Sequence, residues 1–285
     1  FRYHFEEGSA DAVYTALAAF QNPDGGFGHA LEPDVRSPAS SVLATTTALQ
    51  KLRTLHTPAQ HPLAANAIAW LFAAYDPALH SWPLVPPAVE DAPHAPWWNQ
   101  AGLAERFGSF QINPRAEVLG YFFEFGEEAD AAALAQRDEL ADQLVNELLA
   151  RTTPLADNEF LCCQRLIDSP GLPERHAVEL QRWLLRMAEG VIATDPAAWS
   201  GYVLQPLQAA PNRAAPLGIP LSHILPANLD YVIQSQNNDG SWSPPWSWFG
   251  AYPDNWPQAE REWRGVLTLE RLEWLHAYDR IELNG

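Results

Sequence analysis

Apolar residues recur every three or four positions along most of this 285-residue chain, the spacing that places them on one face of a helix. The alternation of apolar and polar residues that is typical of strands is nearly absent. Several of the 25 prolines sit where a helix has to begin or end. The pattern predicts an all-α protein with ten helices in five consecutive pairs, at roughly residues 8–20, 39–55, 60–75, 114–126, 128–150, 155–168, 173–192, 196–209, 222–236 and 259–278.

A short motif follows two of these helices. Residues 21–27 read Q-N-P-D-G-G-F, residues 236–242 read Q-N-N-D-G-S-W, and residues 76–82 form a degenerate third copy, D-P-A-L-H-S-W. An Asp-Gly pair supplies a side-chain acceptor and a residue that tolerates positive φ, so the chain can reverse sharply between two helices. We interpret the motif as part of the scaffold and not as catalytic residues.

These copies resemble the Q-W repeats of squalene-hopene cyclases, related terpenoid cyclases and protein prenyltransferase β-subunits. The resemblance covers residues 21–242 and implies an α/α toroid of five to six helical hairpins, forming a single domain over residues 1–285. Outer helices would end at the motif, and inner helices would line a central cavity. Because the chain starts at Phe1 and not at Met, we expect that native N-terminal residues are missing, and these could supply a sixth hairpin.

The active-site signatures of those enzymes do not occur in this sequence. It contains no D-x-D-D string for a catalytic acid and no D-D-x-x-D string for magnesium and diphosphate. The only cysteines, Cys162 and Cys163, are adjacent, so on a helix they point in different directions and cannot both reach one metal ion. We therefore expect two buried cysteines, no metal site and no cofactor. The resemblance implies a scaffold but no particular reaction.

The charge balance is strongly acidic. The 17 basic and 35 acidic residues give a net charge of −18, which disfavours nucleic acid as a partner, and we interpret most of the charge as solvated helix faces. The chain has neither an uninterrupted apolar run of about 18 residues nor a signal-peptide pattern at its start. We expect a soluble cytoplasmic protein without an integral membrane segment, and peripheral contact with a membrane stays open.

The acidic loop, residues 29–38, follows the first copy of the motif. Glu32 and Asp34 flank a proline, and burial together with mutual repulsion can move their pKa values apart, as acid–base catalysis requires. The alternative is helix capping, with Asp34 or Ser37 at the start of the next helix. The substrate-binding candidates in this loop are His29 and Arg36.

The tryptophan-pair loop, residues 86–99, contains four prolines that stiffen it. Long ordered loops are often functional, and a pair of tryptophans is unfavourable to leave in solvent. We predict that His94, Trp97 and Trp98 contact a substrate. The alternative is a lid that only plugs the barrel.

The C-terminal tryptophan loop, residues 242–256, holds four of the chain's 12 tryptophans. Asp254 in this loop and Glu260 in the next helix are candidate acids. Glu260 and Arg264 share a helix face, and the alternative for them is a plain surface ion pair. The candidates for the cavity wall and for substrate contact are Trp246, Trp248, Tyr252, Trp256, Glu262, Trp263 and Arg264.

Two further carboxylates, Glu117 and Glu159, fall near the starts of predicted inner helices. Equivalent positions in a toroid would bring them to one rim of the cavity, so both are substrate-binding candidates. The alternative is a favourable interaction with the helix dipole.

Together these residues favour an enzyme that starts the cyclisation or isomerisation of an isoprenoid, or of another apolar small molecule, by protonating it. Aromatic rings would stabilise the cation that forms. Positive charge is scarce in these loops, which disfavours a diphosphate substrate and magnesium. The candidate proton donors, in order of preference, are Asp34, Glu32, Asp254 and Glu260.

Two other classes of function stay open. Paired carboxylates and tryptophan platforms also suit a carbohydrate-active α/α-barrel hydrolase or lyase. A non-catalytic binding or interaction domain with an acidic, aromatic mouth is the third hypothesis.

Overall fold

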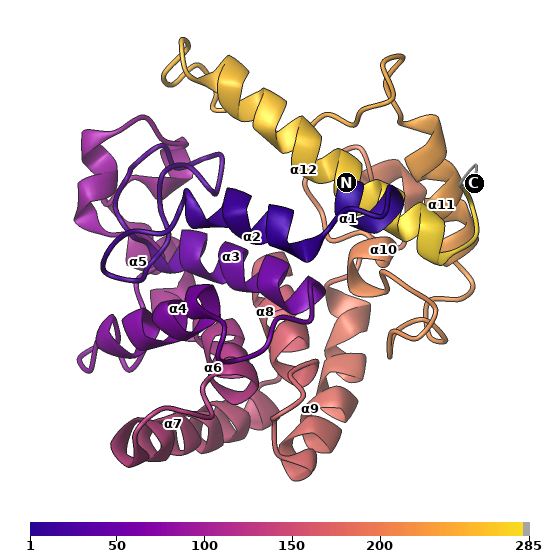
Figure 1. Cartoon of the computed structure of the whole chain (residues 1–285). Helices are drawn as coiled ribbons and strands as arrows, with labels where there is room; N and C mark the ends of the chain where they lie inside the picture. Colours follow the sequence, from indigo (N-terminus) through magenta and orange to yellow (C-terminus); the bar gives the residue numbers. More distant parts are fainter. Residues whose placement is uncertain (282–285) are drawn as a thin grey trace. The chain divides into compact units, whose positions relative to one another are not determined.

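The computed structural model describes residues 1–281 and is built from helices (Figure 1). Within those residues it contains isolated β-bridges but no named strand, which confirms the prediction of an all-α fold. Contacts divide the chain into a larger unit, Ala10–Arg186, and a smaller unit, Phe1–Ser9 with Met187–Gly285. Each unit is described by itself.

The predicted helices appear within a few residues of their expected places, with one exception. The larger unit contains α2 (Ala10–Ala18), α3 (Val42–Thr54), α4 (Pro62–Ala73), α5 (Leu103–Arg106), α6 (Arg115–Phe125), α7 (Ala131–Ala150), α8 (Asp157–Ile167) and all but the last residue of α9 (Glu174–Met187). The smaller unit contains α1 (Arg2–Phe5), α10 (Pro206–Ala209), α11 (Leu225–Gln234) and α12 (Trp256–Ala277).

The exception is the helix predicted at 196–209, which was wrong. The structure has a single 3-10 turn at Pro196–Ala198, then an irregular stretch, and then the four-residue helix α10. Pro206 cannot donate a backbone hydrogen bond, so it begins a new helix and cannot continue one. The apolar spacing of the segment is therefore real, but the helix is interrupted.

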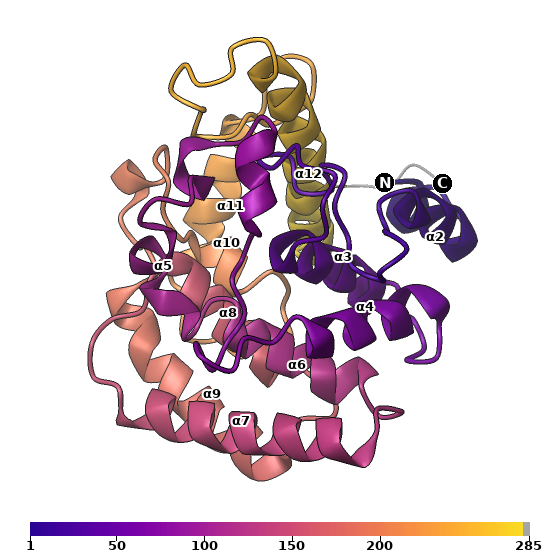
Figure 2. The ribbon, with the colours of Figure 1, turned by 90° about the vertical axis from the view of Figure 1, so that its left-hand side faces the viewer.

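Helix α6 packs against several other helices of the larger unit. Helix α6 contacts α3 and α8, while α4 and α7 also pack against α6, which lies between them in Figures 1 and 2. Ten of the eleven residues of α6 are buried. A side chain at Gly120 would come within 3.0 Å of the Leu166 backbone, so α6 and α8 approach each other as closely as only glycine allows. Helix α6 is therefore the centre of this unit.

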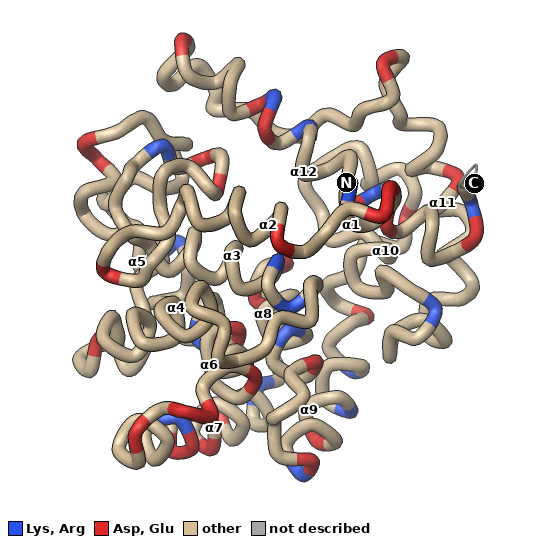
Figure 3. The backbone as a smooth tube through the Cα atoms, in the orientation of Figure 1, with Lys and Arg blue, Asp and Glu red and all other residues tan. Residues whose placement is uncertain are grey.

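Acidic residues are dense along and around α7 (Figure 3). Asp138, Asp142 and Glu147 on this helix have side chains that are more than half exposed. Each of them forms an ion pair with an arginine. Such charges are solvated and need no ligand to stabilise them.

The two clear copies of the motif fold into the same turn, one in each unit. The side-chain Nε2 of Gln21 donates to the carbonyl of Gly25, and that of Gln236 donates to the carbonyl of Gly240, both at 2.9 Å. The two glycines have φ of 95° and 82°. This is the left-handed region that glycine adopts readily, so the Asp-Gly pair reverses the chain as predicted.

The aromatic residue of each copy is bound to the helix that follows. The backbone N–H of Phe27 donates to Thr45 Oγ1 at 3.0 Å, and the N–H of Trp242 donates to Thr268 Oγ1 at 3.3 Å. Both aromatic side chains are buried. The motif therefore joins two helices into a hairpin in each unit.

The degenerate third copy keeps the role of its aromatic residue. Trp82 Nε1 donates to the carbonyl of Leu71 at 2.7 Å, just as Trp242 Nε1 donates to the carbonyl of Val232 at 2.8 Å. Both indoles thus satisfy a carbonyl of the preceding helix. The third copy lacks the Asp-Gly pair, but its tryptophan keeps the same hydrogen bond to the preceding helix.

Alanine substitution of the two motif glycines should have unequal effects. An added Cβ at Gly25 would lie 2.6 Å from the carbonyl oxygen of Asn66, whereas at Gly240 the nearest atom is 4.0 Å away. Gly240→Ala should cost about 1–2 kcal/mol from its backbone conformation alone, and Gly25→Ala at least twice as much. Thermal unfolding of both variants measures this, and equal losses would contradict it.

Candidate functional site

The acidic loop and the tryptophan-pair loop lie side by side in the larger unit. The Arg36 N–H donates to the carbonyl of Pro93, and the Ala95 N–H donates to the carbonyl of Asp34, both at 2.9 Å. An antiparallel bridge between Val35 and His94 lies between these two bonds. The fold thus joins two of the three loops that the sequence singled out.

Glu32 has the most unusual environment of the predicted acids. The residue is 8% exposed, and its Oε2 is buried without a hydrogen-bond partner. Burial and the neighbouring Asp34 raise the pKa of Glu32 well above its ordinary value, although the backbone amides of Asp34 and Val35 and the charge of Arg36 oppose the shift. The protonated acid is therefore favoured, as general acid catalysis requires.

Asp34, the preferred proton donor from the sequence, lies in the same acidic loop as Glu32 and is 3% exposed. Its charge is one of the causes that raise the pKa of Glu32, after burial. The alternative role in helix capping is wrong. The residue that caps α3 is Ser41, whose side chain accepts from the Ala44 N–H at 3.1 Å.

His94 forms hydrogen bonds to two other residues of the tryptophan-pair loop. It is 1% exposed, with Nδ1 2.7 Å from the carbonyl of Ala92 and Nε2 2.9 Å from Asn99 Oδ1. Both ring nitrogens are engaged, which suits a residue that shapes the loop.

The two tryptophans of this loop have different environments. Trp98 is buried and stacks on Phe107 with ring centroids 5.0 Å apart, and its Nε1 has no acceptor. Trp97 is partly exposed, and its carbonyl accepts from Arg106. His29 is exposed and is held 2.8 Å from Asn22 Oδ1 in the turn. Of the two tryptophans, Trp97 is the one with access to a ligand.

The C-terminal tryptophan loop belongs to the smaller unit. Trp248 is fully buried between Tyr252 and Trp256, while Trp246 packs edge-on against Trp263 at 5.1 Å. The rings therefore pack largely on one another.

The acids near this loop are less enclosed than Glu32. Asp254 is exposed, and Glu260 is partly exposed. Glu262 accepts a hydrogen bond from Gln258 at 3.0 Å. Asp254 and Glu260 are therefore both more accessible to solvent than Glu32.

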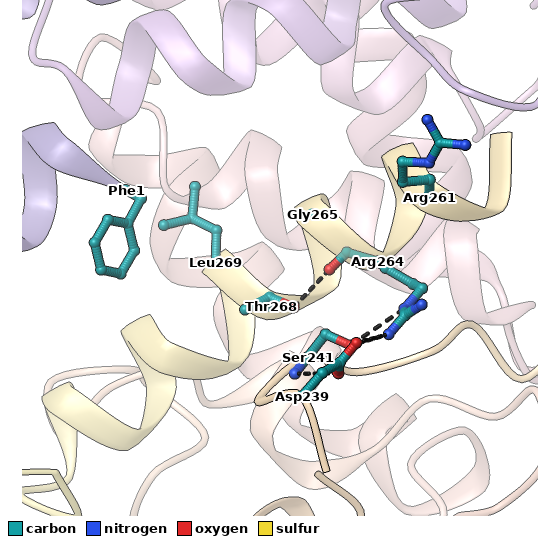
Figure 4. A pocket seen from close by; sticks show the side chains of 8 residues that line it. All are labelled: Phe1, Asp239, Ser241, Arg261, Arg264, Gly265, Thr268 and Leu269. Carbon is teal, nitrogen blue, oxygen red and sulfur yellow. Dashed lines mark hydrogen bonds and ion pairs between the residues drawn. The ribbon is translucent and has the colours of Figure 1, made fainter. Parts of the chain in front are cut away.

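Arg264 pairs with the motif turn. Its guanidinium binds Asp239 and Ser241, so the alternative of a pair with Glu260 is wrong. Hydrogen bonds from Ser241 and from Arg264 lower the pKa of Asp239 to about 2. These residues line an open pocket of about 470 Å³ (Figure 4), from which the Arg261 guanidinium points away.

Glu117 is the centre of a buried polar network on helices α3, α6 and α8. Its Oε1 accepts from Gln50 and Tyr121, both at 2.8 Å, and its Oε2 accepts from Arg165 at 3.0 Å and from the Cys162 thiol at 3.5 Å. Burial opposes ionisation, but Arg165 and the other donors outweigh it and lower the pKa of Glu117. Glu117 is therefore an ionised anchor with all its acceptor positions filled.

Arg53 on α3 completes this network. It forms an ion pair with Glu124, and it donates to Ser169 Oγ at 2.8 Å and to the carbonyl of Arg165 at 2.9 Å. Its guanidinium lies 4.7 Å from the centre of the Tyr121 ring. All three guanidinium nitrogens of Arg53 therefore donate to acceptors within the protein.

Glu159 interacts with the start of its own helix, which was the alternative to substrate binding. Its Oε2 accepts from the Ala156 N–H at 3.0 Å, at the start of α8, and lies 3.5 Å from Arg151. A carboxylate in this position satisfies a free amide and favours the helix dipole. Nothing in its contacts points to a ligand.

Both cysteines are buried and free, as expected. Burial and the charge of Glu117 raise the pKa of Cys162, so it is a thiol donor and not a thiolate. In residues 1–281, no group of three or more His, Cys, Asp or Glu side chains is arranged to hold a metal ion.

Most partners of Glu117 lie far from it in the sequence and could not be predicted from it. Gln50 lies 67 positions away from Glu117 in the chain, and Arg165 lies 48 positions away. Only Tyr121, four residues along the same helix, could have been found from spacing.

No helix in the described part of the chain is both long and apolar enough to span a membrane. Comparisons with protein-family models, with curated proteins and with solved structures found no match to this chain.

Glu32→Gln should change the pH dependence of stability. Because the folded-state pKa of Glu32 is raised above its ordinary 4.5, the stability from its protonated form is complete below that value and is lost as pH rises through the folded-state value. Glutamine cannot ionise, so the variant should match the wild type near about pH 4 and be more stable near about pH 8. Thermal unfolding across this range, with the exposed Asp91→Asn as control, tests it. A constant difference at all pH values would contradict the argument.

Proposed function

We propose that this chain is an α/α-toroid enzyme that protonates an apolar isoprenoid-like substrate to start its isomerisation or cyclisation, with Glu32 as the proton donor. One observation carries the proposal: Glu32 is buried, one of its carboxyl oxygens has no partner, and its pKa is raised. A neutral carboxylic acid is the group that this chemistry requires at neutral pH. Glu32 therefore replaces Asp34 as the preferred donor.

The surroundings of Glu32 suit both halves of a proton cycle. The acid gives its proton to an alkene carbon, and the carboxylate that remains is stabilised by the amides of Asp34 and Val35 and by Arg36. The electron pair of the double bond forms the new C–H bond, and a carbocation results. Loss of a proton from a neighbouring carbon to the carboxylate restores the acid and forms the new alkene. Partly exposed Trp97 offers a π face to the cation.

Two features support the toroid. Alternate helices α3, α6 and α8 contact one another in succession, which is how inner helices of such a ring are ordered. The motif turns in the two units also contain equivalent hydrogen bonds, from the glutamine side chain to the glycine carbonyl. A ring of such hairpins would place the acidic and tryptophan-pair loops at one rim.

The test is incubation of the protein with squalene, farnesol-type alcohols and prenyl diphosphates, followed by product analysis. Glu32→Gln should reduce turnover by about 10²–10⁴-fold, while Asp91→Asn, an exposed acid in the tryptophan-pair loop, should leave it unchanged. Conversion of none of these substrates, full activity of Glu32→Gln, or hydrolysis of an oligosaccharide in their place would overturn the proposal.

Two neighbouring substitutions should move the pH profile in opposite directions. The charge of Asp34 raises the pKa of Glu32, and that of Arg36 lowers it. With Asp34→Asn, the pH at which activity is lost on the alkaline side should fall, and with Arg36→Gln it should rise. Shifts in the same direction would show that Glu32 is not the titrating donor.

A further inference from the structure

Arg165 on α8 differs from the other charged members of the buried network. Its Nη1 donates to Glu117 at 3.0 Å, while its Nε and Nη2 have no acceptor among residues 1–281. Its side chain is 32% exposed, whereas that of Glu117 is 5% exposed. One edge of the guanidinium is thus held in the core, and the other faces outward.

The orientation of this guanidinium is determined by its surroundings. Glu117 is itself fixed by Gln50, Tyr121 and Cys162, so it cannot follow Arg165 if that side chain moves. The carbonyl of Arg165 is bound by Arg53, which fixes the backbone at the same position. A planar group held in this way keeps two parallel N–H donors in one direction, and this is the geometry that binds a carboxylate or phosphate through two hydrogen bonds.

The local charge disfavours a ligand that carries several negative charges. Arg165 and Arg53 are each paired with a glutamate, and Asp168 lies near enough for both arginines to oppose the rise in its pKa that burial causes. The region therefore has more acidic than basic groups. A diphosphate would meet this excess of negative charge, while a monocarboxylate needs only the two outward donors.

We propose that Arg165 is a binding residue for the carboxylate group of a small ligand, and that Glu117 is the residue that positions it. This site rests on the α3, α6 and α8 network and does not depend on Glu32 being a proton donor. The expected mode is a pair of parallel hydrogen bonds from Nε and Nη2 to the two carboxylate oxygens.

The test uses acetate and inorganic phosphate as probes of the whole chain. In a spectrum of the arginine Nε–Hε groups, the Arg165 signal, identified by its absence in Arg165→Lys, should shift saturably with acetate and less with phosphate. Saturation-transfer NMR on the acetate methyl group should show binding at least tenfold weaker in Arg165→Lys. Lysine keeps the charge and the pairing with Glu117, so folding should persist, and circular dichroism checks this.

Two further variants separate a site from general attraction to arginine. Glu117→Gln should weaken acetate binding severalfold because it releases the guanidinium, and Arg182→Lys on the exposed face of α9 should leave it unchanged. No saturable shift at Arg165, equal binding by Arg165→Lys, or a preference for phosphate would overturn the proposal. These outcomes are independent of whether Glu32→Gln is active.

Discussion

Replacement of Trp82 by alanine is expected to lower the free energy of unfolding by about 3–5 kcal/mol. Trp82 is fully buried, its ring packs edge-on against Phe122 and Tyr75, and its Nε1 donates to the carbonyl of Leu71. Alanine would leave a cavity beside α6 and a buried carbonyl without its donor. Urea denaturation monitored by circular dichroism measures the loss.

Trp82→Phe is the matched variant, because it keeps an aromatic ring and removes the indole donor with only part of the ring volume. We expect it to cost about 1–3 kcal/mol, the range for a buried acceptor left without a partner. A loss below about 1 kcal/mol for Trp82→Ala would mean that the site collapses around the smaller side chain. The contact of Trp82 with α4 would then contribute little to stability.

Breaking the Glu117–Arg165 pair should have an effect of similar size. Arg165→Leu leaves the ionised Glu117 buried without its counter-charge, which typically costs about 3–5 kcal/mol. The double variant Glu117→Gln/Arg165→Leu should recover most of this loss, because no charge is then left unpaired. Denaturation of the two single variants and of the double variant gives the coupling between the residues.

The pH dependence of this loss has a definite sign. In the wild type the pKa of Glu117 is lowered, so its stabilising effect is present above the ordinary value of 4.5 and is lost as pH falls through the folded-state value. Without Arg165, burial would raise that pKa, and protonation would relieve the unpaired charge. The deficit of Arg165→Leu should therefore shrink as pH falls, whereas the exposed Arg182→Leu should show no such trend. A deficit that grows in acid would contradict the assignment.

Several features of the candidate site could be predicted from residue types alone. Glu32 and Asp34 are candidates because two acids that flank a proline can shift each other's pKa, and His94 is a candidate because it lies beside a tryptophan pair in a proline-stiffened loop. The fold brings their two loops together through the Val35 and His94 bridge. Which acid would be neutral could not be predicted, because the pKa depends on burial and on neighbours that only packing supplies.

Other expectations failed because they relied on spacing within one segment. Ser37 stands close to the start of α3, but the backbone geometry makes Ser41 the cap. Arg264 shares a helix face with Glu260, yet its partner is Asp239 in the motif turn. Each true partner depends on where the helix begins or on contacts across the fold.

The sequence by itself determined the class of the fold, the places of most helices and the two clear motif turns. These depend on local physics: the period of apolar residues, the missing N–H of proline and the left-handed conformation open to Gly25 and Gly240. Only the tertiary structure decided that Glu32 is buried with a raised pKa, and that Glu117 is ionised beside Arg165. Desolvation and charge pairing act through space, between groups that the chain brings together from far apart, and no local pattern records them.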